Sequence, residues 1–160
     1  MKPLVTYLND HLAGSISAIE MLDYLIETHE GDPLAKFLQD LRTDIVADQD
    51  VLKKIVSRFK ANESAIRKAG AWLVEKFAQI KFAAGGQKKK QLGLMQALEV
   101  LVLGITGKQL LWRALSAAIG SSPLLRGVDL TRLEERAIEQ IERVETQRLQ
   151  IAGKVLLSAK

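Results

Sequence analysis

Apolar residues recur at every third or fourth position through most of this chain, the spacing that places side chains on one face of an α-helix. The clearest run is interrupted once, at Asp48, and consists of Leu34, Leu38, Leu41, Ile45, Leu52, Ile55 and Phe59. The strict alternation of polar and apolar residues that marks β-strands is missing from the sequence. The chain is therefore predicted to be all-α.

Proline and glycine mark the predicted helix boundaries. Proline is tolerated in the first turn of a helix, and glycine often follows the last turn. These marks are Pro3, Gly31 with Pro33, the pair Gly85-Gly86, and Gly120 with Pro123. Asp32 and Asp129 stand where an N-cap residue is needed. The predicted long helices lie near residues 4–29, 33–60, 91–119 and 130–158.

The stretch from Asn62 to Ala84 is also predicted to be helical, because Ile66, Leu73 and Phe77 lie on one stripe. Twenty residues of helix rise about 30 Å, enough to return the chain from the end of the second long helix to the start of the third. The predicted fold is an all-α four-helix bundle with a helical crossover between helices two and three, in one domain over residues 1–160. An up-and-down five-helix bundle is the alternative.

Composition excludes several classes of protein. The chain has 160 residues and no cysteine, so disulfides, thiolate metal sites and cysteine nucleophiles are excluded. Its first residues are too polar for a signal peptide. The most apolar segment, Leu92 to Ile119, is interrupted by Glu99, Lys108 and Arg113, and it is predicted to be the most buried helix rather than a membrane span. We expect a cytoplasmic protein without a transmembrane segment.

Charge is segregated along the chain. Counting Lys and Arg against Asp and Glu, residues 1–50 carry a net charge of −7 and residues 51–126 a net charge of +11. Two interpretations follow: the acidic and basic segments face each other within one bundle, or the basic crossover binds an anionic polymer or membrane surface. The first is favoured, and no specific nucleic-acid binding is expected.

Acidic residues lie near the middle of each long helix, at Glu20, Asp48, Glu99 and Glu142. Carboxylates on four helices are the layout of a two-metal site. The segment Ala18–Leu25, followed by a Gly-Asp-Pro turn and Leu34–Leu41, resembles the ferritin-like superfamily, particularly its small rubrerythrin-type members. This resemblance implies a Glu on the first helix and Glu-x-x-His on the second, repeated in the second hairpin. Glu20 matches the first of these positions, and Glu99 and Glu142 match helices three and four more loosely.

The histidines of that pattern are missing. The two histidines of the chain, His11 and His29, lie near opposite ends of the first helix and cannot serve one site at its middle. An all-carboxylate site of Glu20, Asp48, Glu99 and Glu142 would suit a hard cation, so divalent iron or manganese is one prediction. The other is that these carboxylates pair with Lys or Arg of the basic middle segment, and that the chain binds no cofactor.

The third helix carries Gly104-Ile105-Thr106-Gly107-Lys108, which lacks the spacing and the preceding strand of a phosphate-binding loop. Its glycines, with Gly93, are predicted to allow close helix approach or a kink near Lys108. Trp112 is predicted to pack in the core, where its ring nitrogen needs one acceptor.

The sequence contains no recognisable catalytic motif. A serine-hydrolase triad needs a histidine, and the chain has only two histidines. We therefore expect a non-enzymatic bundle that acts through protein interaction or through an apolar cavity. The divalent-metal-binding carboxylate protein is the alternative. The nearly all-apolar third helix predicts a homodimer, because an isolated bundle usually keeps one polar face on each helix. A further protein partner of unknown identity is also expected.

Overall fold

The computed structural model describes residues 2–59, 75, 78 and 86–157. These residues form four long helices and one short 3-10 helix, and none of them lies in a strand, so the all-α prediction is confirmed. The elements are α1 (Lys2–Thr28), α2 (Pro33–Arg58), α4 (Gln87–Ile119), η2 (Pro123–Leu125) and α5 (Leu130–Leu156).

The helix ends agree with the predicted ends to within two residues, apart from the start of α4. That helix begins at Gln87 rather than near residue 91. Gly86 is its N-cap, and the Gln and Lys residues that follow are good helix formers, so the helix starts directly after the glycine. The predicted N-caps are confirmed, since the Asp32 carboxylate accepts from the Leu34 N–H at 3.1 Å and the Asp129 carboxylate from the Arg132 N–H at 2.9 Å.

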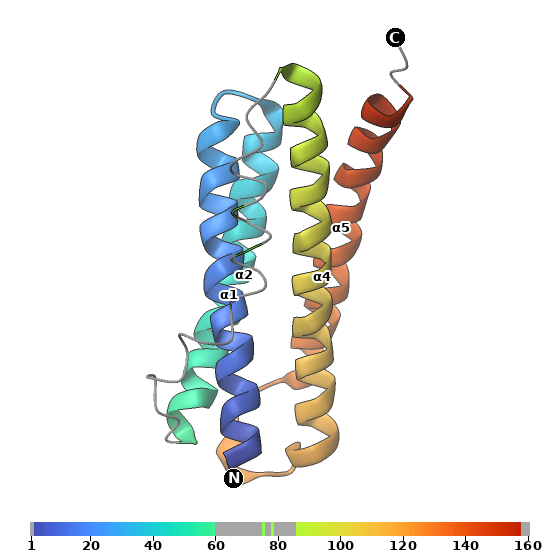
Figure 1. Ribbon diagram of the computed structural model, residues 1–160. Coiled ribbons are helices and arrows are strands. Elements are labelled where there is room, and N and C mark those ends of the chain that lie inside the picture. The colour runs from blue at the N-terminus through green and yellow to red at the C-terminus, as the bar shows by residue number, and fades with distance from the viewer. Residues whose placement is uncertain (1, 60–74, 76–77, 79–85, 158–160) are drawn as a thin grey trace.

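The helices form two antiparallel hairpins, α1 with α2 and α4 with α5, as Figure 1 shows. Helices α2 and α4 run in the same direction, so Phe59 at the end of α2 and Gly86 at the start of α4 lie at opposite ends of the bundle. The predicted helix from Asn62 to Ala84 falls, except for Glu75 and Ala78, outside the described residues.

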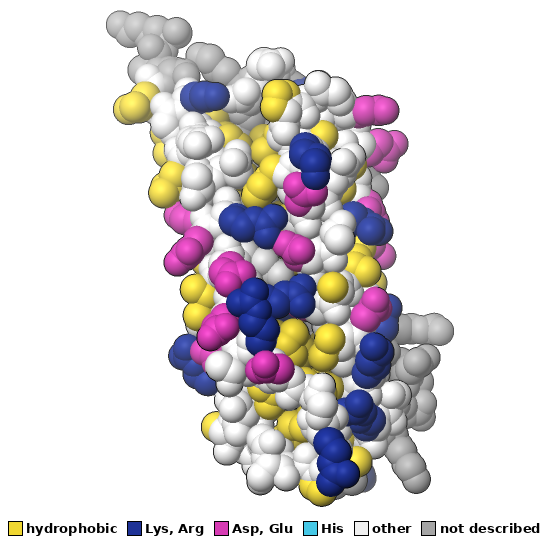
Figure 2. Space-filling view, turned by 180° about the vertical axis from the view of Figure 1, so that it is seen from behind, with side chains coloured by type: hydrophobic (Ala, Val, Ile, Leu, Met, Phe, Trp, Pro, Cys, Tyr) yellow, Lys and Arg dark blue, Asp and Glu magenta, His cyan; other side chains and the backbone are white. Residues whose placement is uncertain are grey.

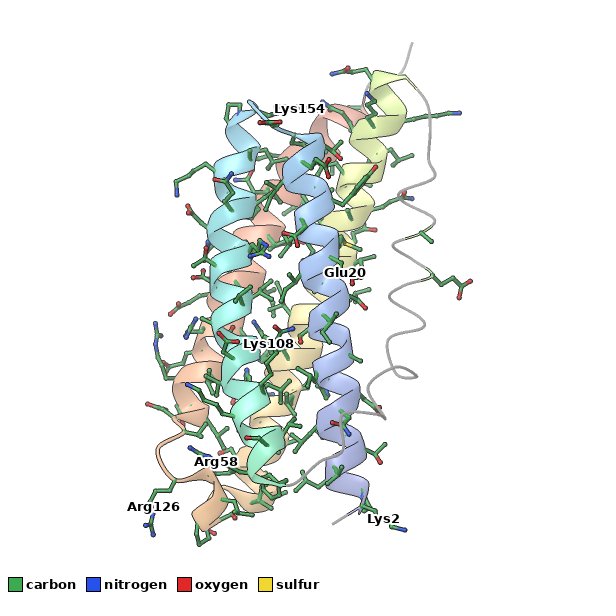
Figure 3. The ribbon with its side chains drawn as sticks, turned by 90° about the vertical axis from the view of Figure 1, so that its left-hand side faces the viewer. Lys2, Glu20, Arg58, Lys108, Arg126 and Lys154 are labelled. Atoms are coloured by element: carbon green, nitrogen blue, oxygen red, sulfur yellow. The ribbon has the colours of Figure 1, made fainter. Side chains whose placement is uncertain are left out.

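One core joins all four helices. It combines side chains that are completely buried on each of them: Leu8 and Leu22 of α1, Leu38 and Leu41 of α2, Leu98 and Leu111 of α4, and Ala137 and Val144 of α5. At the lower end of the bundle, Arg58 donates to the carbonyl oxygens of Leu124 and Arg126, at 3.1 Å each. Figure 3 shows Arg58 and Arg126 at this end. This contact ties the loop containing η2 to the end of α2.

Helix α4 is buried on one side only. Leu103 and Leu110 are 57% and 51% exposed. Residues Lys89–Ile119 are long and apolar enough to cross a membrane by length and composition alone, a test that the core helix of a soluble protein also passes. Leu98, Leu111 and Trp112, which are completely buried, lie on the side of α4 that packs against the other helices.

Candidate functional site

Asp48, the residue that interrupts the apolar stripe of α2, is the centre of a buried polar network. The Asp48 side chain is 0% exposed, and its Oδ2 accepts from Lys108 Nζ at 2.6 Å and from Gln140 Nε2 at 2.9 Å. Lys108 Nζ also donates to the side-chain oxygen of Gln140. Three helices, α2, α4 and α5, therefore meet in one set of charge-assisted hydrogen bonds.

The second oxygen of Asp48 is held mainly by charge. The Arg136 guanidinium lies 3.1 Å from Asp48 Oδ1, yet no donor among the described residues makes a well-angled hydrogen bond to this atom. We take Arg136 as a charge neighbour rather than a hydrogen-bond donor, because direction matters as much as distance. One turn along α2, Asp44 pairs with Arg143 at 2.6 Å. The network therefore continues between α2 and α5.

Burial lowers the pKa of Lys108 from its ordinary value. The main cause is desolvation of the ammonium group, to which the nearby charge of Arg136 adds, while the charge and the hydrogen bond of Asp48 oppose the shift. The ammonium nitrogen nevertheless has two oxygen partners within the bundle. Figure 3 shows Lys108 at mid-height, among the helices. Lys108 thus compensates the charge of Asp48 in the interior of the bundle.

A half-open cavity of about 280 Å³ lies beside this network, between α1, α2 and α4. Its wall is mainly apolar, with Leu52, Leu103 and Leu111 among its lining residues, and Asp48 and Lys108 also lie on it. A concave, mostly apolar site with few polar groups is the common form of a small-molecule site. Its position next to the most polar part of the interior makes it the candidate functional site.

The cavity exists because small residues face each other across it. Gly14 and Ala18 line it from α1, and Gly104 and Gly107 line it from α4. A Cβ atom at Gly104 would meet no described atom within 4 Å, and one at Gly107 would meet only His11 Cε1, at 3.9 Å. The described residues therefore show no close helix approach at Gly104, nor at Gly93, where a Cβ atom would likewise meet no described atom within 4 Å. Glycines on α1 and α4 contribute no side-chain volume to the cavity. At Gly104, the described residues leave the space beside α4 open.

Trp112 lines the same cavity and is completely buried. Its indole Nε1–H has no hydrogen-bond acceptor among the residues that the structure describes. Buried indole donors usually find a partner, and an unmade hydrogen bond at such a place is costly. The core position predicted for Trp112 is confirmed, whereas the acceptor that its ring nitrogen needs is not supplied by the described part of the chain.

His11 closes one side of the cavity and meets Tyr7 edge to face, with ring centroids 4.6 Å apart. Desolvation lowers the pKa of His11 from its ordinary value of 6.5, and the charge of Asp10 opposes the shift only in part. The neutral imidazole is therefore the form that the fold favours.

This lowered pKa predicts a pH dependence of stability. Because the unfolded chain binds a proton at His11 more readily than the folded chain, the free energy of unfolding should fall as the pH drops through about 6.5. In denaturant titrations, the His11→Gln variant should lose less stability between pH 7.5 and pH 5.5 than the natural chain. An equal loss in both proteins would contradict the assignment.

The four predicted metal ligands are not brought together. Asp48 is held by Lys108, Arg136 and Gln140, and Glu99 pairs with Arg148 at 2.9 Å. Glu20 and Glu142 are exposed, and Figure 3 shows Glu20 on the outer side of α1. Within the described ranges, no group of three or more His, Asp or Glu side chains is placed to hold a metal ion. These donors therefore do not fit a shared cation.

The partners of the acidic residues differ from those expected. Lys108 comes from the basic middle segment, but Arg136, Arg143 and Arg148 come from α5, whose charges balance. Figure 2 shows Lys and Arg side chains interspersed with Asp and Glu along the rear face. The sequence analysis did not identify Gln140 as a member of the network. The signal was present, because Gln140 lies three residues after Ala137 and four before Val144, on the apolar stripe of α5.

Comparison of the chain with protein-family models, with curated proteins and with solved structures found no match. The geometry of the cavity and of the network beside it is therefore what indicates the function of the chain.

Proposed function

We propose that this chain is a non-enzymatic helical bundle that binds a small, neutral, mainly apolar molecule in the cavity between α1, α2 and α4. The observation that carries this proposal is the half-open space of about 280 Å³ that remains where Gly104 and Gly107 face Gly14 and Ala18. Side chains normally fill the interior of a protein, so a space of this size beside a packed core needs a reason.

The size of the cavity selects the size of the ligand. Benzene occupies an engineered apolar cavity of about 150 Å³ in another protein. By that scale, a cavity of about 280 Å³ suits a fused bicyclic molecule of about eleven heavy atoms. The charges on the wall select for neutrality, because Asp48 is already compensated by Lys108 and Arg136. A charged ligand would leave a net charge with little water around it.

Titration with naphthalene tests this proposal. We expect saturable binding of one naphthalene per chain, and a rise in the midpoint of thermal unfolding with ligand concentration by mass action. The anionic analogue 2-naphthoate is the control and should bind much more weakly. Preference for 2-naphthoate, weakened steeply by salt, would support binding of anions to basic surface residues instead. Binding of neither compound would refute the proposed function.

We also propose that the bundle is a ferritin-like fold in which ion pairs replace the metal site. The parallel course of α2 and α4 supports this relation, as does the position of Asp48 near the middle of α2. The homodimer, the further protein partner and the cytoplasmic location stay predictions. Leu103 and Leu110, exposed on α4, are apolar surface that a partner would bury.

A further inference from the structure

Helix α4, which runs the length of the bundle beside α5 in Figure 1, carries an apolar stripe on its outward side. The members of this stripe are all exposed: Leu92, Leu103, Leu110, Ala114 and Ala117. They follow one another at intervals of 11, 7, 4 and 3 residues, each close to a whole number of helical turns, so they share one face. A contiguous apolar surface of this kind marks a place where a partner binds.

Two residues of opposite charge lie on the same side of α4, Glu99 before the two central leucines and Arg113 after them. Within the chain, Glu99 pairs with Arg148 and Arg113 pairs with Glu134. The side chains of Glu99 and Arg113 nevertheless stay 47% and 60% exposed. Each therefore has room for a second group of the opposite charge.

The order of these residues is self-complementary when the direction of the helix is reversed. Leu103 and Leu110 are equally far from the point between residues 106 and 107, and Glu99 and Arg113 are equally far from residue 106. An antiparallel copy of the helix therefore places leucine opposite leucine and Glu99 opposite Arg113. A parallel copy would place like charges opposite each other, which is unfavourable.

From this pattern we infer that α4 pairs with α4 of a second copy of the chain, antiparallel, about a two-fold axis beside Thr106. The same patch then serves both subunits, so each contact occurs twice and the assembly closes as a dimer. Thr106 suits the centre of such an interface, because its hydroxyl already donates to the Val102 carbonyl at 2.8 Å and leaves no donor unpaired.

Charge reversal tests the register of the two helices. In sedimentation equilibrium of the full-length protein in dilute buffer we expect a dimer, and Glu99→Arg should raise its dissociation constant at least about tenfold, since like charges then face each other twice. Arg113→Glu should have a similar effect. The double variant, Glu99→Arg with Arg113→Glu, should come within about threefold of the natural constant. Recovery cannot come from Arg148 and Glu134, because both pairs within the chain stay broken in the double variant.

Replacing an apolar residue of the stripe tests its location. Leu110→Lys should be monomeric at concentrations at which the natural chain is a dimer, whereas Ile16→Lys, at a residue 38% exposed on α1, should not change the assembly. Asp23→Arg is the control for Glu99→Arg, because it breaks a surface pair with Arg42 away from α4. Leu110 is not among the cavity-lining residues, so Leu110→Lys should still bind naphthalene, which separates this inference from the proposed function.

Three outcomes would overturn the inference. A natural chain that stays monomeric at about 1 mM would leave the stripe to another occupant, such as the part of the chain between Phe59 and Gly86. A dimer that survives Leu110→Lys unchanged would use another surface. A double charge variant that associates no more tightly than the single variants would contradict the antiparallel register.

Discussion

Replacing Asp48 by alanine should lower the free energy of unfolding by about 3–5 kcal/mol, the range for removing one partner of a buried ion pair. The loss follows because Lys108, whose side chain is 15% exposed, would be left in the interior without the carboxylate that lies 2.6 Å from its Nζ. Gln140 would lose its acceptor at the same time. Equilibrium unfolding in urea, followed by circular dichroism, measures the difference.

The matched control is Asp40→Ala on the same helix. Asp40 pairs with Lys36 on the surface, where the two side chains are 50% and 75% exposed, and such pairs contribute little. The double variant Asp48→Leu with Lys108→Met should recover most of the lost stability, since an apolar pair of similar volume often replaces a buried ion pair without loss. An Asp48→Ala variant no less stable than Asp40→Ala would contradict the structural role of the network.

Replacing Gly104 by phenylalanine should abolish ligand binding without unfolding the protein. A Cβ atom at Gly104 meets no described atom within 4 Å, so the ring would project into the cavity and take up about the volume of benzene, roughly half of the space. We expect the affinity for naphthalene to fall by at least about 100-fold, because a bicyclic molecule would no longer bury its surface. Stability should hold or rise, because glycine within a helix costs about 0.5–1 kcal/mol.

Gly153→Phe is the control for this variant. Gly153 lies on α5, is exposed, also has open space at its Cβ position and is not among the cavity-lining residues. Its affinity for naphthalene should equal that of the natural chain. Undiminished binding by a folded Gly104→Phe protein would show that the ligand occupies another place on the molecule.

The helices could be predicted from sequence because each buries a nearly continuous apolar stripe, and capping residues such as Asp32 and Asp129 mark where helices start. Asp48 could be recognised as unusual for the same reason, since it interrupts a stripe. Its partners could not be recognised, because Lys108 and Gln140 are 60 and 92 residues away along the chain. Which charges meet depends on how the helices are rotated, which the spacing within one helix does not determine.

The mid-helix carboxylates show the same limit. A carboxylate near the middle of a long helix is equally consistent with a metal ligand and with half of an ion pair. The difference lies in what the neighbouring helices present, and at Asp48 and Glu99 they present Lys108, Arg136 and Arg148. Glycines have a similar ambiguity, because a missing side chain permits either close approach or an open space. Small residues on the facing helix, Gly14 and Ala18, leave the space open here.

The most direct test of the proposed function is to locate the bound ligand by nuclear Overhauser effects between naphthalene protons and the methyl groups of the protein. The cavity predicts contacts to Leu52, Leu103 and Leu111, which lie on its wall. It predicts none to Leu156, which is exposed near the end of α5. Contacts confined to the first set would place the ligand between α1, α2 and α4. Contacts to Leu156 instead, or saturable binding with no contact to the cavity wall, would contradict the account.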